Sequence, residues 1–224
     1  MSLLSSSPDA VIFDFDGVIV QSVEIKAEAF ATIYRNENPE LVRAIIEYQH
    51  AHGGVSRREK FKHFEREFFG RDPTPEAIEA LSRKFTSIVY DAVVGCPFVD
   101  GAPEALETLH AHIPLYLVSG TPHDELIPIV EARRLARFFK GIYGAPATKP
   151  QAFRNILDAN GFDAGRTVAI GDSPTEYEAA FHLGMPFVAI VPRGGASRFP
   201  SDVAALPDLV GLAGLLLSRD TSRR

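Results

Sequence analysis

Short apolar runs separated by longer amphipathic stretches dominate the pattern of hydrophobic and polar positions along the chain. Four runs have the length and continuous apolar character of buried parallel strands: residues 10–15, 113–118, 167–170 and 186–191. Apolar residues recur at helical spacing over residues 104–110, 124–139, 151–160 and 176–183. This alternation predicts an α/β fold, in which a parallel sheet carries helices on both faces.

Residues 23–95 interrupt that alternation. The stretch is rich in Glu, Lys, Arg and Phe and contains no clear strand pattern. Its phenylalanines recur at helical spacing, which favours the core of a helix bundle over an aromatic substrate pocket: Phe61, Phe64, Phe68 and Phe69. The pattern therefore predicts a core domain of residues 1–22 and 96–224, with a helical domain inserted at 23–95.

Composition and charge narrow the class of protein further. The net charge of -6 provides no basic surface for nucleic acid or an anionic membrane, so a small anionic substrate would need a local cation or metal. The single cysteine, Cys96, excludes an internal disulfide and is expected to be a buried or half-buried thiol. The apolar runs are too short to span a membrane and no secretion signal is visible, which predicts a cytoplasmic protein.

Two carboxylates follow the first predicted strand. Asp14 and Asp16 are two residues apart, so their side chains should point the same way, and Gly17 allows a sharp turn just after them. Like charges held together disfavour ionisation unless a cation or a shared proton compensates. The pair therefore predicts either a divalent metal site or an acid that works beside an ionised partner.

Further polar residues lie where other strands end or helices begin. Ser119 and Gly120 follow the second strand, Asp172 follows the third, and Lys149 precedes a helix. Ligands of open α/β sheets bind outside the carboxyl ends of the strands, so these side chains should converge there. Taken alone, Ser119 is more simply an ordinary turn serine, and Lys149 is equally compatible with a solvated lysine.

Two helix starts are predicted from capping chemistry. Thr121 is expected to cap a helix that has Pro122 at its first position. Ser173 and Glu176 match the S-x-x-E capping box, with Pro174 at the first helical position. This match predicts a structural role for Glu176 ahead of a catalytic one.

Together and in this order, the motifs resemble those of the haloacid dehalogenase superfamily. The matching segments are Asp14-Phe15-Asp16-Gly17-Val18, Ser119, Lys149, and Gly171-Asp172-Ser173 with Glu176. The insertion after the first motif is similar to the helical cap of the phosphatase and phosphomutase branch, which includes phosphoglycolate phosphatase and β-phosphoglucomutase. The resemblance implies a Rossmann-like core domain and an α-helical cap domain. Glu176 stands where the family usually has Asp.

The resemblance implies roles for the three aspartates. Asp14 would attack a phosphoryl group and form an aspartyl-phosphate. Asp16 would protonate the leaving oxygen and then deprotonate the attacking water, and its presence argues against a true dehalogenase. Mg²⁺ is the implied cofactor, with Asp14, Asp172 and the backbone carbonyl of Asp16 as ligands.

The resemblance also implies a binding site for the substrate. Ser119, Gly120 and Lys149 would hold the transferring phosphoryl group. Arg57 follows a glycine-containing turn in the cap and would pair with a second phosphate or a carboxylate, although a solvated arginine is the alternative. Lys84 lies near a cap lysine of the mutase branch, but the residues after it do not continue that pattern.

Three functions are compatible with these residues. The first is a Mg²⁺-dependent phosphatase, a phosphoric monoester hydrolase, acting on a small phosphorylated metabolite such as phosphoglycolate or a sugar phosphate. The second is a sugar phosphomutase, which returns the phosphoryl group to a bound sugar instead of to water. The third is a non-catalytic binding or regulatory protein on the same fold. The substrate and the oligomeric state are not predicted.

Overall fold

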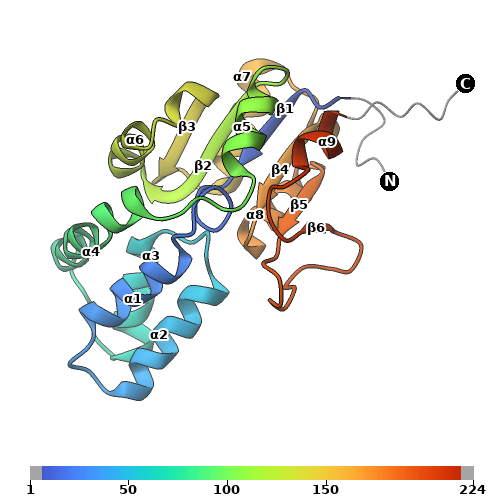
Figure 1. The fold of residues 1–224 in the computed structure, drawn as a ribbon. Coiled ribbons are helices and arrows are strands. Elements are labelled where there is room, and N and C mark those ends of the chain that lie inside the picture. The colour runs from blue at the N-terminus through green and yellow to red at the C-terminus, as the bar shows by residue number, and fades with distance from the viewer. Residues whose placement is uncertain (1–6, 218–224) are drawn as a thin grey trace, which may run out of the picture.

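A single parallel sheet organises residues 7–217, which are the residues that the computed structural model describes. Within them, six strands are arranged in the order β3-β2-β1-β4-β5-β6 (Figure 1). Their bounds are β1 (Ala10–Phe13), β2 (Leu115–Pro122), β3 (Phe139–Ala145), β4 (Thr167–Gly171), β5 (Phe187–Ile190) and β6 (Ala204–Leu206). Every neighbouring pair is parallel, which confirms the predicted sheet.

Helices pack on both faces of this sheet. In the core they are α5 (Ala102–His110), α6 (His123–Ala132), α7 (Lys149–Asn160), α8 (Pro174–His182) and α9 (Leu212–Leu217). Val11 and Phe13 of β1 belong to the same buried cluster as residues of α5, α6 and α9. Ala10 and Ile12 belong to a second cluster with residues of α7 and α8. The twofold alternation of strand side chains therefore separates two apolar layers.

The inserted segment is helical, as predicted. It contains α1 (Val23–Ile33), α2 (Pro39–Ala51), α3 (Arg57–His63), a π-helical turn over Phe64–Phe68 and α4 (Pro75–Gly95). Phe61 and Phe64 are fully buried and pack edge-on against Phe30, with ring centroids 5.2 and 5.3 Å apart, while Phe68 and Phe69 are half-buried around them. The phenylalanines therefore form the core of the cap. The division at residues 22/23 and 95/96 stays a prediction.

Some local predictions were wrong. Residues 124–139 do not form one helix, because α6 ends at Ala132, Arg134 adopts a left-handed backbone at φ 59°, and Phe139 begins β3. The strands β3 and β6 had not been predicted. Helix-like apolar spacing continues beyond Ala132 because Leu135 and Phe138 are buried from a short 3₁₀ turn rather than from an α-helix.

Two other expectations concern single features. Cys96 is a free, buried thiol, as predicted. Across residues 7–217, no helix combines the length and the apolar character that crossing a bilayer requires.

Candidate active site

The candidate site lies where β1 and β4 end side by side. Phe13 of β1 is in register with Ile170 of β4, and the backbone N–H of Asp14 donates to the Ile170 carbonyl at 2.9 Å. The two strands are central neighbours from which the order runs outward in opposite directions. At such a switch point the loops diverge and leave a crevice, which is where α/β sheets bind ligands. Asp14 and Asp172 follow these two strands directly.

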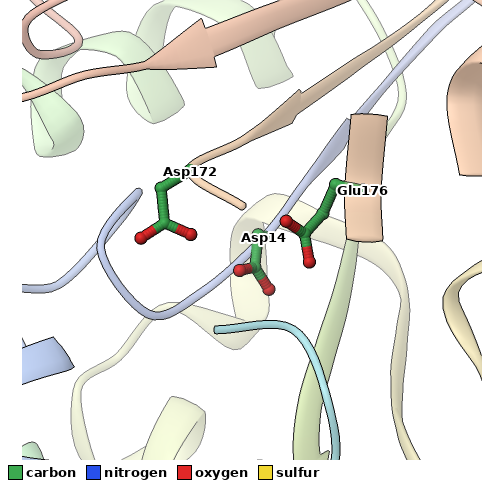
Figure 2. A group of neighbouring side chains, drawn as sticks. All are labelled: Asp14, Asp172 and Glu176. Atoms are coloured by element: carbon green, nitrogen blue, oxygen red, sulfur yellow. The ribbon is translucent and has the colours of Figure 1, made fainter. Parts of the chain in front are cut away.

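Three carboxylates converge in this crevice. One carboxylate oxygen from each of Asp14, Asp172 and Glu176 lies within 4.8 Å of the other two. Figure 2 shows the three carboxylates grouped together. Burial raises the pKa of Asp14 to about 7, although the Lys149 ammonium acts in the opposite direction. Desolvation, together with the charges of Asp14 and Glu176, raises the pKa of half-buried Asp172 well above its usual range. The cluster therefore carries more negative charge than its protein surroundings balance.

Lys149 is the cation nearest to that cluster. It is the first residue of α7, and its ammonium contacts Asp14 Oδ1 at 2.5 Å, the Val118 carbonyl at 2.7 Å and Glu176 Oε1 at 2.9 Å. Burial opposes the charged form, but the two carboxylates outweigh it and raise the pKa of Lys149. The sequence left Lys149 open as either functional or solvated. In the structure it is a buried, permanently charged ammonium that contacts Asp14, the candidate nucleophile.

Glu176 serves two structural purposes at once. One carboxylate oxygen accepts hydrogen bonds from the Ser173 hydroxyl and from its backbone N–H at 3.1 Å, which confirms the predicted capping box of α8. The other oxygen is the one that faces Lys149. The side chain thus holds the start of α8 against the acidic cluster, and its contact with the lysine had not been predicted.

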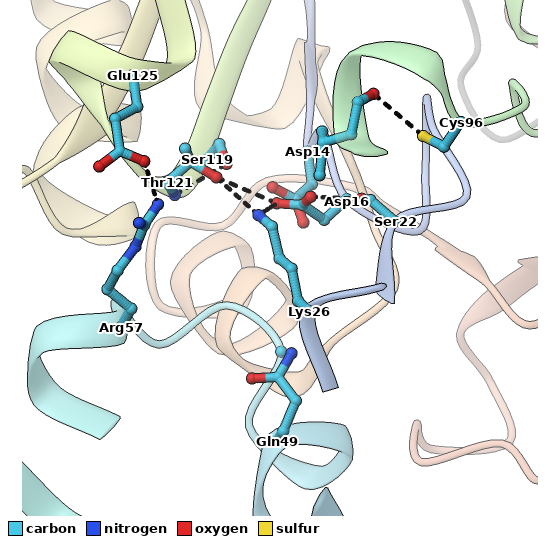
Figure 3. A network of polar contacts seen from close by, with 12 residues as sticks. Asp14, Asp16, Ser22, Lys26, Gln49, Arg57, Cys96, Ser119, Thr121 and Glu125 are labelled. Atoms are coloured by element: carbon cyan, nitrogen blue, oxygen red, sulfur yellow. Dashed lines mark hydrogen bonds and ion pairs between the residues drawn. The ribbon is translucent and has the colours of Figure 1, made fainter. Parts of the chain in front are cut away.

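Asp16 faces the same cavity as Asp14 but has different partners (Figure 3). Its carboxylate accepts from Ser22 Oγ at 2.5 Å, Lys26 Nζ at 2.5 Å and Thr121 Oγ1 at 3.3 Å. Burial alone would raise the pKa of Asp16, but the charge and hydrogen bond of Lys26 outweigh it and lower this pKa. Asp16 is therefore held as a carboxylate, whereas burial makes Asp14 harder to ionise.

Thr121 does not have the capping role predicted for it. The strand β2 continues through Pro122, α6 begins at His123, and no side chain caps that helix. The Thr121 hydroxyl instead accepts from Lys26 at 2.8 Å and reaches Asp16. Its backbone N–H donates to the buried Ser119 hydroxyl at 3.1 Å. The extended chain turns this threonine into part of the polar network around Asp16.

Gly120 lies against a loop of the cap. A Cβ atom at Gly120 would come within 2.9 Å of the Gly54 carbonyl oxygen, and a Cβ at Gly54 would come within 1.8 Å of Thr175 Oγ1. Only backbone without side chains can make so close an approach. The cap is therefore closed directly over Ser119 and the start of α8.

Arg57 joins the cap to the core. Its guanidinium forms an ion pair with Glu125 of α6, donates to Thr86 Oγ1 at 2.8 Å and lies 4.7 Å from the centre of the Phe85 ring. Glu125 in turn accepts from Thr86 at 2.7 Å. With the cap closed, the Arg57 guanidinium is paired with Glu125. Substrate binding by Arg57 therefore stays a prediction. Lys84 is exposed on α4.

Two larger clefts flank a small cavity beneath the cap. The cavity, of about 40 Å³, is lined on the core side by Asp14, Asp16 and Asp172 and on the cap side by Arg57 and Lys60. A cleft of about 660 Å³ includes Ser119, Gly120 and Lys149, and one of about 810 Å³ includes Asp172. Both clefts are lined by cap and core residues.

Several of these side chains were not predicted from the sequence. Ser22 and Lys26 are four residues apart at the start of α1, a spacing that places them on one helix face beside the Asp16 turn. Arg57 and Lys60 are three apart on α3, so a second cation on the face of Arg57 was readable from the sequence. No local signal pointed to Glu125, because its partner is 68 residues away.

The fold and the site define a class: a protein with a parallel α/β core, a cluster of carboxylates at the carboxyl ends of its central strands, and a helical cap inserted after its first strand. The chain belongs to the haloacid dehalogenase-like hydrolase family, whose model matches residues 11–190. A phosphoglycolate phosphatase of Rhodospirillum rubrum is 27% identical over 223 residues, which are 91% of this chain and 91% of that protein. The expected class, a phosphoric monoester hydrolase, is confirmed.

Solved structures share the fold. CbbY from Rhodobacter sphaeroides in complex with phosphate superposes with a TM-score of 0.71 at 20% identity, covering 94% of this chain and 100% of that chain. YfnB from Bacillus subtilis bound to magnesium gives a TM-score of 0.70 at 18% identity and covers 94% and 99%. These likenesses confirm the α/β core with its inserted cap.

Proposed function

We propose that this protein is a Mg²⁺-dependent phosphatase that hydrolyses a small phosphorylated metabolite, of the phosphoglycolate or sugar phosphate class, through an aspartyl-phosphate on Asp14. One observation carries the proposal: the buried Asp14 carboxylate lies 2.5 Å from the Lys149 ammonium at the sheet edge where Ser119 and Asp172 also lie. A carboxylate nucleophile beside a fixed cation suits attack on an anionic phosphoryl group. The phosphoglycolate phosphatase relatives support the substrate class.

The acidic cluster fits a divalent cation. Three carboxylates have oxygens within 4.8 Å of one another, and Lys149 contacts only two of them, Asp14 and Glu176. Burial disfavours the ionisation of Asp14, so a bound cation would relieve charge that the protein leaves unbalanced. Carboxylate and carbonyl oxygens are the donors that Mg²⁺ prefers. We assign Asp14, Asp172 and the Asp16 carbonyl as ligands, with Glu176 close enough to contribute. When bound, Mg²⁺ supplies positive charge that reduces repulsion between nucleophile and phosphate.

The reaction then divides between the two aspartates. The Asp14 carboxylate forms a bond to phosphorus while the bond to the leaving oxygen breaks, and Asp16 gives that oxygen a proton. Lys149 and Ser119 hold the oxygens of the transferring group. Water next cleaves the aspartyl-phosphate, and Asp16 accepts its proton. The Lys26 contact keeps Asp16 ionised, which is the form that this second step needs. For the first step Asp16 must take up a proton from solvent, which requires that substrate displace Lys26.

The cap must move for a substrate to enter. A cavity of about 40 Å³ has room for about three water molecules, which is less than a phosphate monoester needs. The close approach of Gly54 to Thr175 leaves no path directly between them. Interdomain movement is described for the similar protein YfnB, which supports opening of the cap here. A small closed cavity favours a small metabolite over a polymer.

The test is phosphate release with Mg²⁺ from p-nitrophenyl phosphate, acetyl phosphate, phosphoglycolate and sugar phosphates. We expect Asp14→Asn to lower kcat by at least about 10⁴-fold, the scale on which loss of a catalytic nucleophile acts. Asp9→Asn is the matched control, because Asp9 precedes the same strand at its opposite end and pairs with Arg166. Formation of an isomer of the substrate without release of free phosphate would show that the protein is a phosphomutase rather than a phosphatase. Absence of turnover with every substrate, unchanged in Asp14→Asn, would favour a non-catalytic protein.

A further inference from the structure

Lys60 is a buried cation of the cap that forms no ion pair with an acid among residues 7–217. The residue is 3% exposed and lines the same cavity as Asp14 and Asp16. Its ammonium donates to the side-chain oxygen of Gln49 at 2.5 Å and to the Gly53 carbonyl at 3.4 Å, both of them neutral groups. Within residues 7–217, no carboxylate lies at ion-pair distance from it. Its direct hydrogen-bond partners are therefore two neutral oxygens, and the Asp16, Asp172 and Glu176 carboxylates act on it only from beyond ion-pair distance.

The other cations around the cavity are all paired. Lys149 contacts Asp14 and Glu176, Lys26 contacts Asp16, and Arg57 contacts Glu125. A buried ammonium without a counter-ion is costly, and proteins rarely keep one without a purpose. Burial, together with the nearby Lys26, lowers the pKa of Lys60 to about 7, and the more distant Asp16, Asp172 and Glu176 carboxylates oppose this shift only in part. An anion that arrives in the cavity would supply the counter-ion.

We propose that Lys60 and Gln49 form a subsite in the cap for a second anionic group of the substrate, a carboxylate or a second phosphate. This inference rests on the proposed function and deepens it: the substrate is a phosphate monoester with a further anion, rather than a neutral sugar monophosphate. The transferring phosphoryl group lies on the core side, at Asp14, and the second anion lies on the cap side, at Lys60.

The cavity walls favour this arrangement. On the core side, Asp16 and Asp172 would repel a second anion, so it must lie toward the cap. The aromatic rings of Phe30 and Phe85 also line the cavity, and the Lys60 ammonium is 6.0 Å from the centre of the Phe30 ring. Apolar walls exclude water and strengthen the attraction between the ammonium and an anion. Bound substrate would thus link the cap to the core through a contact absent from neutral monoesters.

The experiment compares matched substrates across matched variants. Phosphoglycolate and 2-hydroxyethyl phosphate differ by a carboxylate against a hydroxymethyl group, and 1,2-ethanediol bisphosphate offers a second phosphate instead. Lys60→Met removes the charge at similar volume, and Lys60→Gln is a second neutral variant that keeps a hydrogen-bonding group. Lys62→Met is the control, because Lys62 lies on the same helix, its side chain is 43% exposed, and it pairs with Glu59 rather than with Gln49.

We expect both Lys60 variants to lose about 10- to 150-fold in kcat/KM on an anion-bearing substrate, the effect of one hydrogen bond to a charged group. They should stay within about twofold of the parent on 2-hydroxyethyl phosphate, and Lys62→Met should match the parent on both. The bisphosphate arm shows which anion the subsite takes. Equal losses on charged and neutral substrates, or no loss on either, would overturn the subsite.

Ligand binding separates this inference from the proposed function. In the Asp14→Asn protein, which is expected not to turn over, phosphoglycolate should raise the thermal midpoint more than 2-hydroxyethyl phosphate does. Adding Lys60→Met should abolish that difference. If the parent hydrolyses no monoester but this difference is present and Lys60-dependent, the proposed function fails and the subsite stands. If turnover is present but the difference is absent, the subsite fails alone.

Discussion

The ion pair between Arg57 and Glu125 gives a quantitative prediction about how the cap is held on the core. Arg57 lies on α3 of the cap and Glu125 on α6 of the core. The Arg57 side chain is 5% exposed and the Glu125 side chain 17% exposed. Desolvation lowers the pKa of Arg57, while Glu125 acts against this effect. Glu125→Gln keeps the size of the side chain but removes its charge, so it leaves a buried guanidinium without its counter-ion.

The expected cost follows from the burial of the two partners. Removing one member of a fully buried ion pair costs about 3–5 kcal/mol, because the other charge stays behind in a poorly solvated place. Water reaches part of Glu125, and Thr86 still accepts one Arg57 hydrogen bond, which reduces this cost. We therefore expect Glu125→Gln to lower the free energy of unfolding by about 2–3 kcal/mol.

Urea unfolding followed by circular dichroism measures this change. Glu131→Gln is the matched control, because Glu131 is exposed on the same helix, and it should stay within about 0.5 kcal/mol of the parent. The double variant Arg57→Met, Glu125→Gln should lose less than the sum of the single variants, since it leaves no unpaired buried charge. Additive losses, or a Glu125→Gln protein as stable as the control, would refute the reasoning.

Three further predictions concern the site itself. Asp16→Asn should lower kcat by about 10²–10⁴-fold with little change in KM, in steady-state assays, because it removes proton transfer but not binding; a large rise in KM with kcat intact would contradict this. Gly54→Ala should destabilise the closed cap by about 1–3 kcal/mol and raise KM, because its Cβ would lie 1.8 Å from Thr175 Oγ1. Gly95→Ala is its control, since no atom lies within 4 Å of a Cβ there, and equal behaviour of the two variants would exclude the clash. Burial raises the pKa of Asp14 from 3.8 to about 7. Between these two values the metal-free folded protein keeps a proton that the unfolded chain has lost. The contribution of Asp14 to the free energy of unfolding is therefore full below about pH 4 and disappears as the pH rises through 7. Mg²⁺ binds the ionised form, so it should raise the thermal midpoint more at about pH 8 than at about pH 6; an equal effect at both would count against Asp14 as a ligand.

Local chemistry explains which elements were predictable. Buried parallel strands are continuously apolar, so the four central runs could be recognised without the fold. The capping box of Ser173 and Glu176 depends on a spacing of three residues and was equally readable. The strand β3 lies at the sheet edge, and most of its residues are half-exposed, so its apolar signal is weak. The apolar residues before β3 recur at helical spacing, so the predicted helix was too long at its C-terminal end.

The hydrogen-bond partners of the polar side chains could not be predicted from local sequence. Thr121 was assigned to a helix cap because its neighbours favour one, yet pairing with β3 keeps the chain extended through Pro122. Its hydroxyl then meets Lys26, which is 95 positions away in the sequence. No propensity or spacing rule acts over that distance, so only packing brings the two together.

The sequence alone determined the α/β pattern, the inserted helical segment, and the residues at the strand ends that carry the candidate chemistry. These features follow from the period of apolar positions and from capping within a few residues, both of which are local. The tertiary structure decided which charged side chains form ion pairs. Lys149 pairs with Asp14 across 135 positions, Lys26 pairs with Asp16, and Arg57 pairs with Glu125. Lys60 pairs with no acid among residues 7–217. Such pairings depend on how distant elements pack together, because electrostatic partners are determined by distance in space and by burial.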